Sequence, residues 1–527
     1  MKIHNLSYSH LPFSQRDKDY ISEPSNLKEY ITAYPSLESL IAQAKIKQGH
    51  EIDRAALSKI ISDQYAAANI KPSVATLDNI EALTDQNTFT IITAHQPSLL
   101  TGPLYYIFKI LSCINLCEHA NGEQDDYKFI PVFINGGEDH DFEEISKVHL
   151  YNNTVTWNTE QSGSVGRMTT DGLTDAIEEV FDILGDRSKV KEWRDTLLQL
   201  AKDVDSYGQF QSGLVDMLFR EYGLVQFSSD GEEVKQILLP VFKAELETQV
   251  SYKTVIPQQE RIKSATGYDP QAYVREINLF YLDKGLRQRI ELVDGVYQVL
   301  DTDITFTSSD IQKLAYSLSP NVILRPITQE YLLPNVAYVG GGGELSYWLD
   351  RKPQFEQFGI PFPLLIRRNS GGIIKAKQLQ QWQDKDYAVA DLFLAEHTIN
   401  NKFLEVQDDS FDLSAEVESA KTLYSKIAEK AKAINPTMEK SVKAMAAQEE
   451  KQLRQLESRL KREIKQRYEV DLNRLMKIQS SVLPNGSLQE RHDNILQYLS
   501  MYGPEFIKEI KENLPVFSKE FTLMVVD

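Results

Sequence analysis

The chain has 527 residues, of which 42% are hydrophobic and 25% are charged. These ordinary globular proportions exclude collagen-like repeats, low-complexity sequence and extended disorder, and the length predicts about two to four structural units. The formal net charge of −19 would repel phosphate backbones and anionic lipid, so we expect neither a nucleic-acid nor a membrane partner. An anionic ligand would therefore need a local basic pocket.

The chain contains two cysteines, Cys113 and Cys117, too few for a disulfide framework. They lie four residues apart in an apolar segment, which favours buried structural thiols over a metal pair, and we expect no metal site. No apolar run reaches the ~18 residues that a membrane span needs. The first ten residues, MKIHNLSYSH, lack the apolar core of a signal peptide. We therefore expect a soluble, cytoplasmic protein.

A strand–helix–strand unit is predicted between residues 88 and 135. Thr88–Ala94 is a short β-branched apolar run, typical of a buried strand. Pro103 opens an apolar segment with helical spacing, and Lys128–Asn135 forms a second apolar run. Such a unit implies parallel strands joined by a right-handed crossover.

Further core strands are predicted at 321–324, 335–339 and 362–366, with inserted regions between 151 and 320. From residue 414 the composition turns helical, which predicts one helix over 414–434 and a long one over 437–482. Val442, Leu453, Ile464 and Leu475 recur every eleven residues in the long helix, a spacing that favours nearly straight helix packing. The expected divisions are residues 1–150 and 321–411 for the two parts of the core, and 151–320 for insertions interleaved with the core. Residues 412–484 are expected to form a helical arm, and 485–527 a segment that returns to the core.

Four unusual loops follow the predicted core strands. Ligands of open α/β sheets bind outside the carboxyl ends of the strands, so we expect the loops at 95–103, 136–141 and 340–344 to line one cleft. The third loop fits neither the dinucleotide fingerprint nor the Walker loop. The candidate residues are His95, Gln96, Thr101 and Gly102 in the first loop, Glu138, Asp139, His140 and Asp141 in the second, Gly340, Gly341, Gly342, Gly343 and Glu344 in the third, and Arg367, Arg368 and Asn369 in the fourth.

Each loop also has a purely structural interpretation. Thr101 and Asp141 could cap the helices that follow them, and two of the four glycines could serve a tight turn. Arg367 and Arg368 could be a surface pair. Four such loops at one edge of a sheet nevertheless favour a functional site.

Three long stretches carry a resemblance to a known family. They are HQPSLLTGPLYYIFKILSCINL from residue 95, PVFINGGEDHDFEEISKVHL from 131, and ILRPITQEYLLPNVAYVGGGGELSYWL from 323. Together with NGSLQERHDN at 485–494, they resemble the bacillithiol biosynthesis cysteine-adding enzyme family in order and over nearly the whole chain.

The resemblance implies an α/β fold with a Rossmann-like parallel-sheet core, related to class I aminoacyl-tRNA synthetases and nucleotidyltransferases. It also implies connecting-peptide insertions, and an α-helical coiled-coil arm that forms a homodimer. The implied activity is that of a ligase which joins L-cysteine to the amine of glucosaminyl malate, the last step of bacillithiol synthesis. The synthetase HIGH motif is not literally present, and no KMSKS-like loop is visible.

Amide formation requires an activated cysteine carboxylate, because hydroxide is a poor leaving group. ATP or another nucleotide would be the activator, with Mg²⁺ as its companion ion. The glycine and helix-start loops would hold phosphate, Glu138 and Asp139 the cysteine ammonium, and Asp141, Glu344 or His140 the proton of the amine. The catalytic candidates are thus Asp139, His140, Asp141 and Glu344. Arg325, Arg367, Arg368 and Arg491 would form a basic patch for the malate carboxylates. The other binding candidates outside the four loops are Tyr105, Tyr347, Asn485 and Gln489.

Two other functions stay open at this stage. One is a different ATP-dependent ligase or nucleotidyltransferase on the same fold. The other is a non-catalytic coiled-coil interaction protein that retains a ligand-binding core, although a scaffold would not need polar loops at its strand ends.

Overall fold

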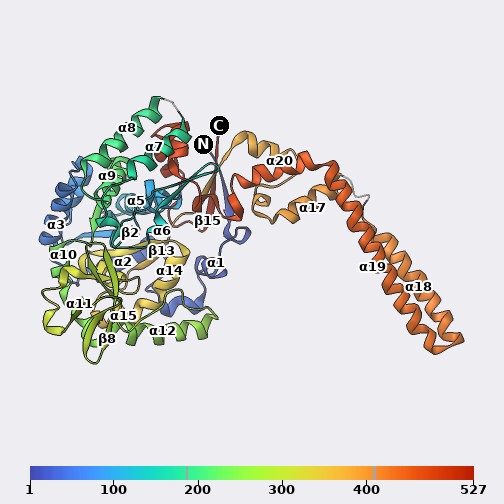
Figure 1. The fold of residues 1–527 in the computed structure, drawn as a ribbon, viewed down its shortest axis with the longest axis horizontal. Coiled ribbons are helices and arrows are strands. Elements are labelled where there is room, and N and C mark those ends of the chain that lie inside the picture. The colour runs from blue at the N-terminus through green and yellow to red at the C-terminus, as the bar shows by residue number, and fades with distance from the viewer. Residues whose placement is uncertain (186–187, 408–410) are drawn as a thin grey trace. The chain divides into compact units, whose positions relative to one another are not determined.

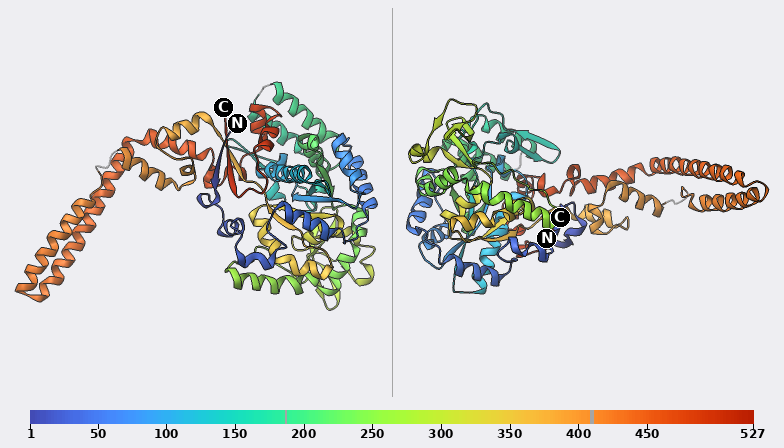
Figure 2. Two further views of the ribbon diagram at one scale, coloured as in Figure 1. Left: turned by 180° about the vertical axis from the view of Figure 1, so that it is seen from behind. Right: turned by 90° about the horizontal axis from the view of Figure 1, so that it is seen from below.

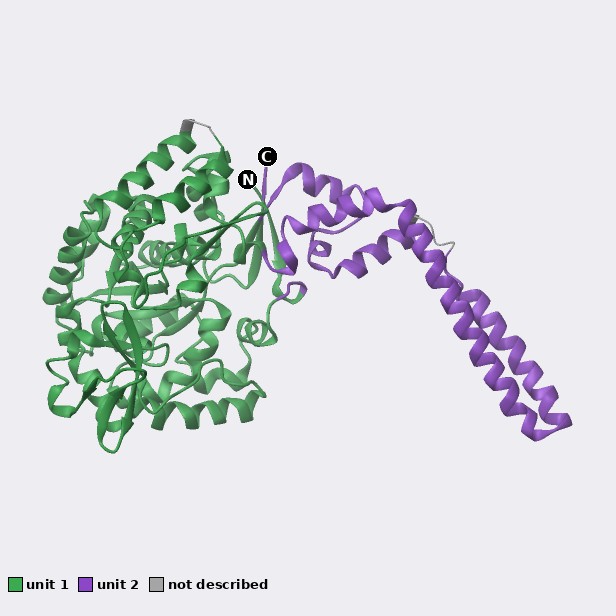
Figure 3. Cartoon of the chain, viewed as in Figure 1, with its two compact units in different colours: residues 1–9, 13–372, 489–524 green, residues 10–12, 373–488, 525–527 purple. Residues whose placement is uncertain are grey.

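The computed structural model describes residues 1–185, 188–407 and 411–527. The chain divides into two compact units (Figures 1 and 3). Unit 1 comprises residues 1–9, 13–372 and 489–524, and unit 2 comprises residues 10–12, 373–488 and 525–527.

A five-stranded parallel sheet forms the centre of unit 1, in the order β13-β12-β2-β3-β6. The strands are β2 (Thr88–His95), β3 (Lys128–Asn135), β6 (Val225–Ser228), β12 (Asn335–Gly340) and β13 (Leu364–Arg367). Their carboxyl ends are in register, because His95 pairs with Asn135, Asn135 with Ser228, and Gly340 with Arg367. The loops that follow these strands therefore start at one edge of the sheet.

The two faces of the sheet bury different side chains. Ile91 packs in a cluster with Cys113 of α5 (Tyr105–Glu123), whereas Ile92 joins the larger core with Ile61 of α3 (Arg54–Ala67). Adjacent strand residues point to opposite faces, so a continuous apolar run marks a strand buried on both sides. Cys113 and Cys117 are free and buried, which confirms the interpretation as structural thiols.

One predicted core strand is wrong. Residues 321–324 form a turn between β11 (Leu318–Pro320) and α13 (Arg325–Leu332). The Asn321 side chain accepts hydrogen bonds from the backbone N–H groups of Ile323 and Leu324, which fixes a turn instead of an extended chain. The strand β11 belongs to a second sheet, in the order β10-β9-β8-β7-β11.

The other elements of unit 1 surround the central sheet. The second sheet contains β7 (Leu279–Asp283), β8 (Leu286–Val293), β9 (Val296–Val299) and β10 (Thr305–Phe306), and β1 (Lys2–Ser7), β15 (Glu520–Val526) and the start of β14 (Gly371–Lys375) form a third, in the order β1-β15-β14. The remaining elements are α1 (Gln15–Ile21), α2 (Leu37–Lys47), α4 (Val74–Ala82), α6 (Phe142–Ile145), β4 (Lys147–Leu150), β5 (Asn153–Thr156), α7 (Leu173–Leu184), α8 (Ser188–Asp203), α9 (Tyr207–Phe219), α10 (Glu232–Ile237), α11 (Leu239–Thr248), α12 (Val250–Thr266), α14 (Gly342–Trp348), α15 (Lys352–Phe358), α21 (Ile495–Tyr502) and α22 (Phe506–Glu512).

Unit 2 is built from helices α16 (Ala376–Gln383), α17 (Glu396–Gln407), α18 (Ser414–Ile434), α19 (Pro436–Arg467) and α20 (Glu469–Ser480). Helices α18 and α19 form a hairpin, visible from two directions in Figure 2. The predicted helix over 437–482 is wrong as a single element, because Tyr468 leaves helical geometry (φ −102°, ψ 16°) between α19 and α20. The Tyr468 ring packs edge-on against Phe403 of α17, a tertiary contact that the local sequence does not reveal.

Candidate active site at the ends of the parallel strands

A cleft of about 800 Å³ lies at the carboxyl edge of the central sheet. Residues of the first three candidate loops line it together, as the order of strands predicts. From the sequence-derived candidates, the lining includes His95, Gln96, Tyr105, Glu138, Asp139, Arg325, Gly341, Gly343, Glu344, Tyr347, Arg368 and Arg491. The cleft therefore brings carboxylates and guanidinium groups from distant parts of the chain into one site.

His95, at the end of β2, is held as a neutral imidazole. Its Nδ1 lies 2.9 Å from the Gln96 carbonyl oxygen, and its Nε2 lies 3.2 Å from the Tyr105 hydroxyl. A carbonyl only accepts, so Nδ1 carries the proton and Nε2 accepts from Tyr105. Burial, with the nearby Lys109 charge, lowers the pKa of His95 to about 4.

We expect the imidazole of His95 to titrate at about pH 4, because protonation would place a cation in a buried site beside Lys109. A pH titration of the ring resonances by NMR measures this value, and the His95→Gln variant identifies the signal. A midpoint near the ordinary histidine value of about 6.5 would contradict the buried, neutral assignment.

Glu344 is an ion-paired carboxylate at the start of α14. Its Oε1 accepts from Lys109 Nζ and from the Tyr338 hydroxyl, each at 2.7 Å, and its Oε2 accepts from the Gly341 N–H at 2.9 Å. Burial raises the pKa of Glu344, but Lys109 and these hydrogen bonds outweigh it and hold the pKa at about 2. A carboxylate with so low a pKa is a weak base, so the geometry does not favour proton abstraction by Glu344.

The two acidic residues after β3 both accept hydrogen bonds from neighbouring side chains. Glu138 accepts from the fully buried Lys235 and from the Ser229 hydroxyl. Asp139 accepts from Gln96 Nε2 at 2.8 Å, and Arg287 Nη1 lies 4.0 Å from its Oδ1. Burial raises the pKa of Asp139, but Arg287 and the Gln96 hydrogen bond outweigh burial, and the pKa lies below its ordinary value. Asp139 thus presents negative charge to the cleft, whereas the Glu138 carboxylate is neutralised by Lys235.

Guanidinium groups supply the positive side of the cleft. Arg325 lies at the start of α13. Its Nη2 donates to the Tyr347 hydroxyl at 3.3 Å, and among the described residues this is the hydrogen bond found for the guanidinium. Arg368 is bound by Glu490, and Arg491 is exposed. Arg325 therefore retains donors for an anionic ligand.

The structure also shows cleft residues that the sequence does not suggest. Arg275, Arg287, Tyr273 and Phe280 reach the cleft from the inserted region. The Arg287 side chain is 7% exposed and stacks over Phe280, 4.1 Å from the ring centroid. The sequence offers one indication of Arg287. The alternating segment LRQRIELV from residue 286 carries two arginines in an otherwise acidic chain.

Several candidates do not line the cleft. His140 and Asp141 line a neighbouring surface pocket instead. His140 Nδ1 lies 2.8 Å from Arg287 Nη1, and Asp141 caps α6 by accepting from the Glu144 N–H. The capping interpretation of Asp141 is therefore confirmed.

Thr101 and Gly102 lie at the end of the first loop, have an unusual backbone conformation and do not line the cleft. Both have positive φ, 71° and 61°, and a Cβ on Gly102 would lie 2.8 Å from Ser98 Cβ. Among the described residues, the buried Thr101 hydroxyl finds no hydrogen-bond partner and no side chain caps α5, so the capping interpretation of Thr101 is wrong. Glycine at 102 satisfies a steric requirement.

The remaining candidates outside the cleft have structural contacts. Arg367 forms a buried ion pair with Asp17, at 2.9 Å and 3.0 Å, so its expected place in a basic patch is wrong. Gly342 approaches the Asp17 carboxylate so closely that a Cβ would overlap it, and a Cβ on Gly340 would lie 2.8 Å from the Tyr338 ring.

Asn369 donates to the Pro515 carbonyl and is buried. Gln489 is buried outside the cleft lining, and Asn485 is exposed in a turn of unit 2. Of the returning segment that begins at 485, Arg491 alone among the three expected residues lines the cleft.

Within residues 1–185, 188–407 and 411–527, no group of three or more His, Cys, Asp and Glu side chains is arranged to hold a metal ion. Within the same ranges, no helix combines the length and apolar character needed to cross a membrane.

A parallel sheet whose strand ends open on a cleft lined by both carboxylates and guanidinium groups is the architecture of a Rossmann-like α/β protein that binds a polar ligand. The family description "Bacillithiol biosynthesis BshC, N-terminal Rossmann-like domain" matches residues 1–369, and "Bacillithiol biosynthesis BshC, C-terminal coiled-coil domain" matches residues 372–526. The chain therefore belongs to the BshC family of bacillithiol biosynthesis. The Rossmann-like core, the coiled coil and the family resemblance expected from the sequence are confirmed.

Similar proteins span nearly the same length. One from Flavobacterium johnsoniae is 34% identical over 98% of both chains, and one from Cytophaga hutchinsonii is 32% identical over 95% of this chain and 94% of its own. One from Bacillus cereus (strain B4264) is 28% identical over 83% and 85%. Each of the three relatives carries the name "Putative cysteine ligase BshC".

Proposed function

We propose that the cleft is the active site of a ligase that joins L-cysteine to the amine of glucosaminyl malate. The observation that carries the proposal is that one cleft holds both the Asp139 carboxylate and the Arg325 guanidinium. The names of the relatives support cysteine as a substrate. The cytoplasmic location expected from the sequence stays a prediction.

The charges in the cleft suit these two substrates. Asp139 is 27% exposed and is the acidic group best placed to bind the cysteine ammonium. Malate carries two carboxylates, which match guanidinium donors in the bidentate manner that arginine favours. We assign this role to Arg325 and Arg491, with Arg275 and Arg287 on the wall formed by the inserted region.

The proposed reaction requires an activated cysteine carboxylate. In the ligation step the amine nitrogen forms the C–N bond, the activating phosphate group leaves with the electrons of the C–O bond, and the amine proton passes to the departing phosphate. ATP is the proposed activator, and the open space beside Gly343 would receive its phosphates. Mg²⁺ would arrive on the phosphates, which hold this ion with few protein ligands.

The three residues expected to act as the base are poorly placed for it. Asp141 and His140 lie outside the cleft lining, and Glu344 has a pKa of about 2. Two other titratable groups of the cleft have pKa values far from neutral pH: the pKa of His95 is about 4 and that of Tyr105 is about 12. We therefore propose that the sugar amine attacks in its own neutral form, oriented by the carboxylates.

Incubation of the pure protein with cysteine, glucosaminyl malate and each nucleotide in turn, with mass detection of the product, tests the proposal. Formation of the cysteine amide with ATP and its absence without nucleotide are the expected results. Ligation in the absence of any activating agent would overturn the activation step. Absence of product with every nucleotide would overturn the assigned reaction.

We also propose that the arm of unit 2 forms a homodimer. Apolar side chains are exposed on each helix of the hairpin: Leu423 (57%) and Ile427 (41%) on α18, and Met438 (47%), Met445 (57%) and Leu456 (46%) on α19. Their spacings of four, seven and eleven residues place those of each helix on one face. Val442 and Ile464, by contrast, are buried within the unit.

Replacement of Met445 and Leu456 by Asp is expected to give monomers without unfolding either unit, because these side chains are exposed and each apolar side chain removed from water contributes roughly 1.5–3 kcal/mol. Light scattering measures the mass, and a matched variant with Asp at exposed Lys443 and Arg459 should remain dimeric. A native protein that is monomeric at micromolar concentration would refute the dimer.

A further inference from the structure

We infer that Lys109, a residue of α5 that does not line the cleft, is a positioning residue that holds the loops at 95–103 and 340–344 in a fixed relation to each other. Its side chain is 1% exposed, so it acts on the site through its neighbours. The lysine interrupts the apolar segment PLYYIFKILSCINL from residue 103, where a buried charge is costly unless it is paired. The part of the inference that concerns catalysis rests on the function proposed above.

The backbone ladder that joins β2 to β12 stops short of the cleft. Its last pair is Ile92 with Tyr338, and the Thr93 hydroxyl then donates to the Val339 carbonyl at 2.8 Å. The residues of β2 that line the cleft come after these positions, starting with Ala94. A contact beyond the ladder is therefore needed to keep the two loops in register.

The Lys109 ammonium supplies that contact. Its Nζ donates to the Ala94 carbonyl, on the β2 side, and to Glu344 Oε1 at 2.7 Å, on the β12 side. Glu344 in turn fixes its own loop, because its Oε2 accepts from the Gly341 N–H at 2.9 Å. A neutral side chain at position 109 would leave this carboxylate, which is 27% exposed, without its ion-pair partner.

The same ammonium acts on the imidazole of His95. Burial is the largest cause that lowers the pKa of His95, and the Lys109 charge lowers it further, to about 4. The Arg325 charge also lowers this pKa, whereas Glu344 and the hydrogen bond with the Gln96 carbonyl raise it. The pKa of His95 therefore reports whether the Lys109 charge is in place.

Hydrogen–deuterium exchange of the full chain, followed by mass spectrometry, tests the link between the two loops without any substrate. In Lys109→Met we expect exchange about tenfold faster in the peptides that cover residues 94–103 and 340–347, because a charge-assisted hydrogen bond to each loop is lost. The NMR titration midpoint of His95 should rise above about 4. Unchanged exchange in either peptide, or an unchanged His95 midpoint, would overturn the inference.

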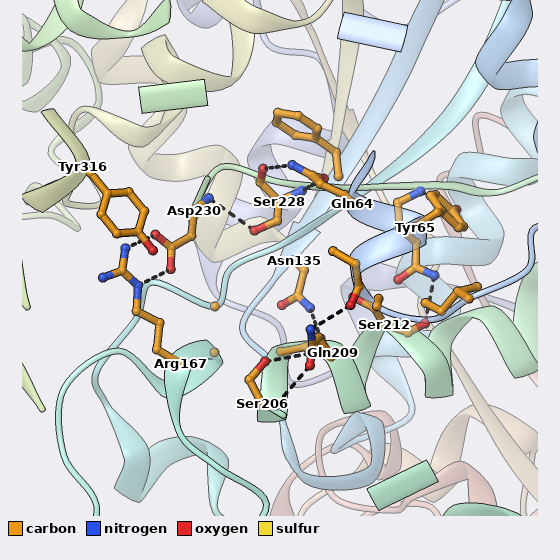
Figure 4. A pocket seen from close by; sticks show the side chains of 18 residues that line it. Gln64, Tyr65, Asn135, Arg167, Ser206, Gln209, Ser212, Ser228, Asp230 and Tyr316 are labelled. Atoms are coloured by element: carbon orange, nitrogen blue, oxygen red, sulfur yellow. Dashed lines mark hydrogen bonds and ion pairs between the residues drawn. The ribbon is translucent and has the colours of Figure 1, made fainter. Parts of the chain in front are cut away.

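The matched control is Arg167→Met, which also removes the cation of an ion pair. Arg167 binds Asp230 through two hydrogen bonds, of 2.7 Å and 2.5 Å, in a second cavity of about 390 Å³ (Figure 4). Among the described residues, none lines both this cavity and the cleft. The control should leave exchange over 94–103 and 340–347 unchanged. Equal acceleration in the two variants would show a general loosening of unit 1 and refute a specific role of Lys109.

Kinetics in the Glu344→Gln background separate positioning from stability. There, Lys109→Met leaves no carboxylate without a partner, so it should not lower the thermal midpoint relative to Glu344→Gln alone. It should nevertheless lower kcat/KM about 100-fold, the loss expected when reacting groups are displaced by about 1 Å. Equal kcat/KM of the single and double variants would refute the positioning role. If the native chain forms no cysteine amide, the proposed function fails, and the exchange and titration results alone decide on Lys109.

Discussion

Replacing Arg325 by methionine is expected to lower kcat/KM for cysteine addition by about 100- to 1,000-fold, the loss typical of one preorganised donor to a developing or bound anion. The guanidinium faces the cleft with the Tyr347 hydroxyl as its described partner. Methionine keeps much of the length of the side chain and removes the charge. The folded structure should persist, because Arg325 forms no salt bridge with a carboxylate in the part of the chain that the structure describes, where its hydrogen-bond partner is Tyr347.

Steady-state kinetics with each substrate varied in turn measures the effect, and thermal unfolding checks the fold. The matched control is Arg289→Met on β8, whose side chain is 34% exposed and lies 4.0 Å from Glu291. It also removes one positive charge from the chain but should leave kcat/KM unchanged. Equal losses in the two variants would show that net charge, rather than Arg325 itself, governs the rate.

The sequence predicts the core of the sheet well because its information is local. Strands β2, β3 and β12 are continuous apolar runs followed at once by polar or glycine-rich loops, and parallel topology then brings those loops together. The strand predicted at 321–324 is a turn because the Asn321 side chain accepts a hydrogen bond from the Ile323 N–H within this short apolar run.

The roles of the site residues could not be predicted because their partners are distant in the chain. Glu344 is paired with Lys109, 235 positions away, and Glu138 with Lys235, 97 positions away. Both carboxylates look free in the sequence and are ion-paired in the fold. Arg367 and Arg368 have different partners because successive residues of an extended chain point to opposite sides. Arg367 binds Asp17, whereas Arg368 binds Glu490 and lines the cleft.

Replacing Glu490 by glutamine is expected to destabilise unit 1 by about 3–5 kcal/mol, because it leaves the Arg368 guanidinium as a buried charge without a counter-ion. The two side chains are 0% and 4% exposed. The Glu490 carboxylate accepts from two Arg368 nitrogens, the Ser370 hydroxyl and the Gly371 N–H. The ion pair also links residues 489–524, the part of the returning segment that belongs to unit 1, to the loop that follows β13.

Denaturant unfolding of the full chain measures the loss, and Glu509→Gln on the exposed face of α22 is the matched control, expected within about 0.5 kcal/mol of the native chain. Adding Arg368→Met to Glu490→Gln removes the stranded cation and keeps an acceptor for Gly371, so it should recover part of the loss.

The pH dependence of the same variant has a definite sign. Burial raises the pKa of Glu490, but Arg368 outweighs it and leaves the pKa below the ordinary value. Stability from such a group is present above the unfolded-state pKa of about 4.3 and is lost as the pH falls through the lower folded-state value. The difference between the native chain and Glu490→Gln should therefore be full at pH 7 and shrink below about pH 4. Equal stability of the two proteins at pH 7 would mean that another group neutralises Arg368, and the ion pair would then lose its assigned role in holding the returning segment.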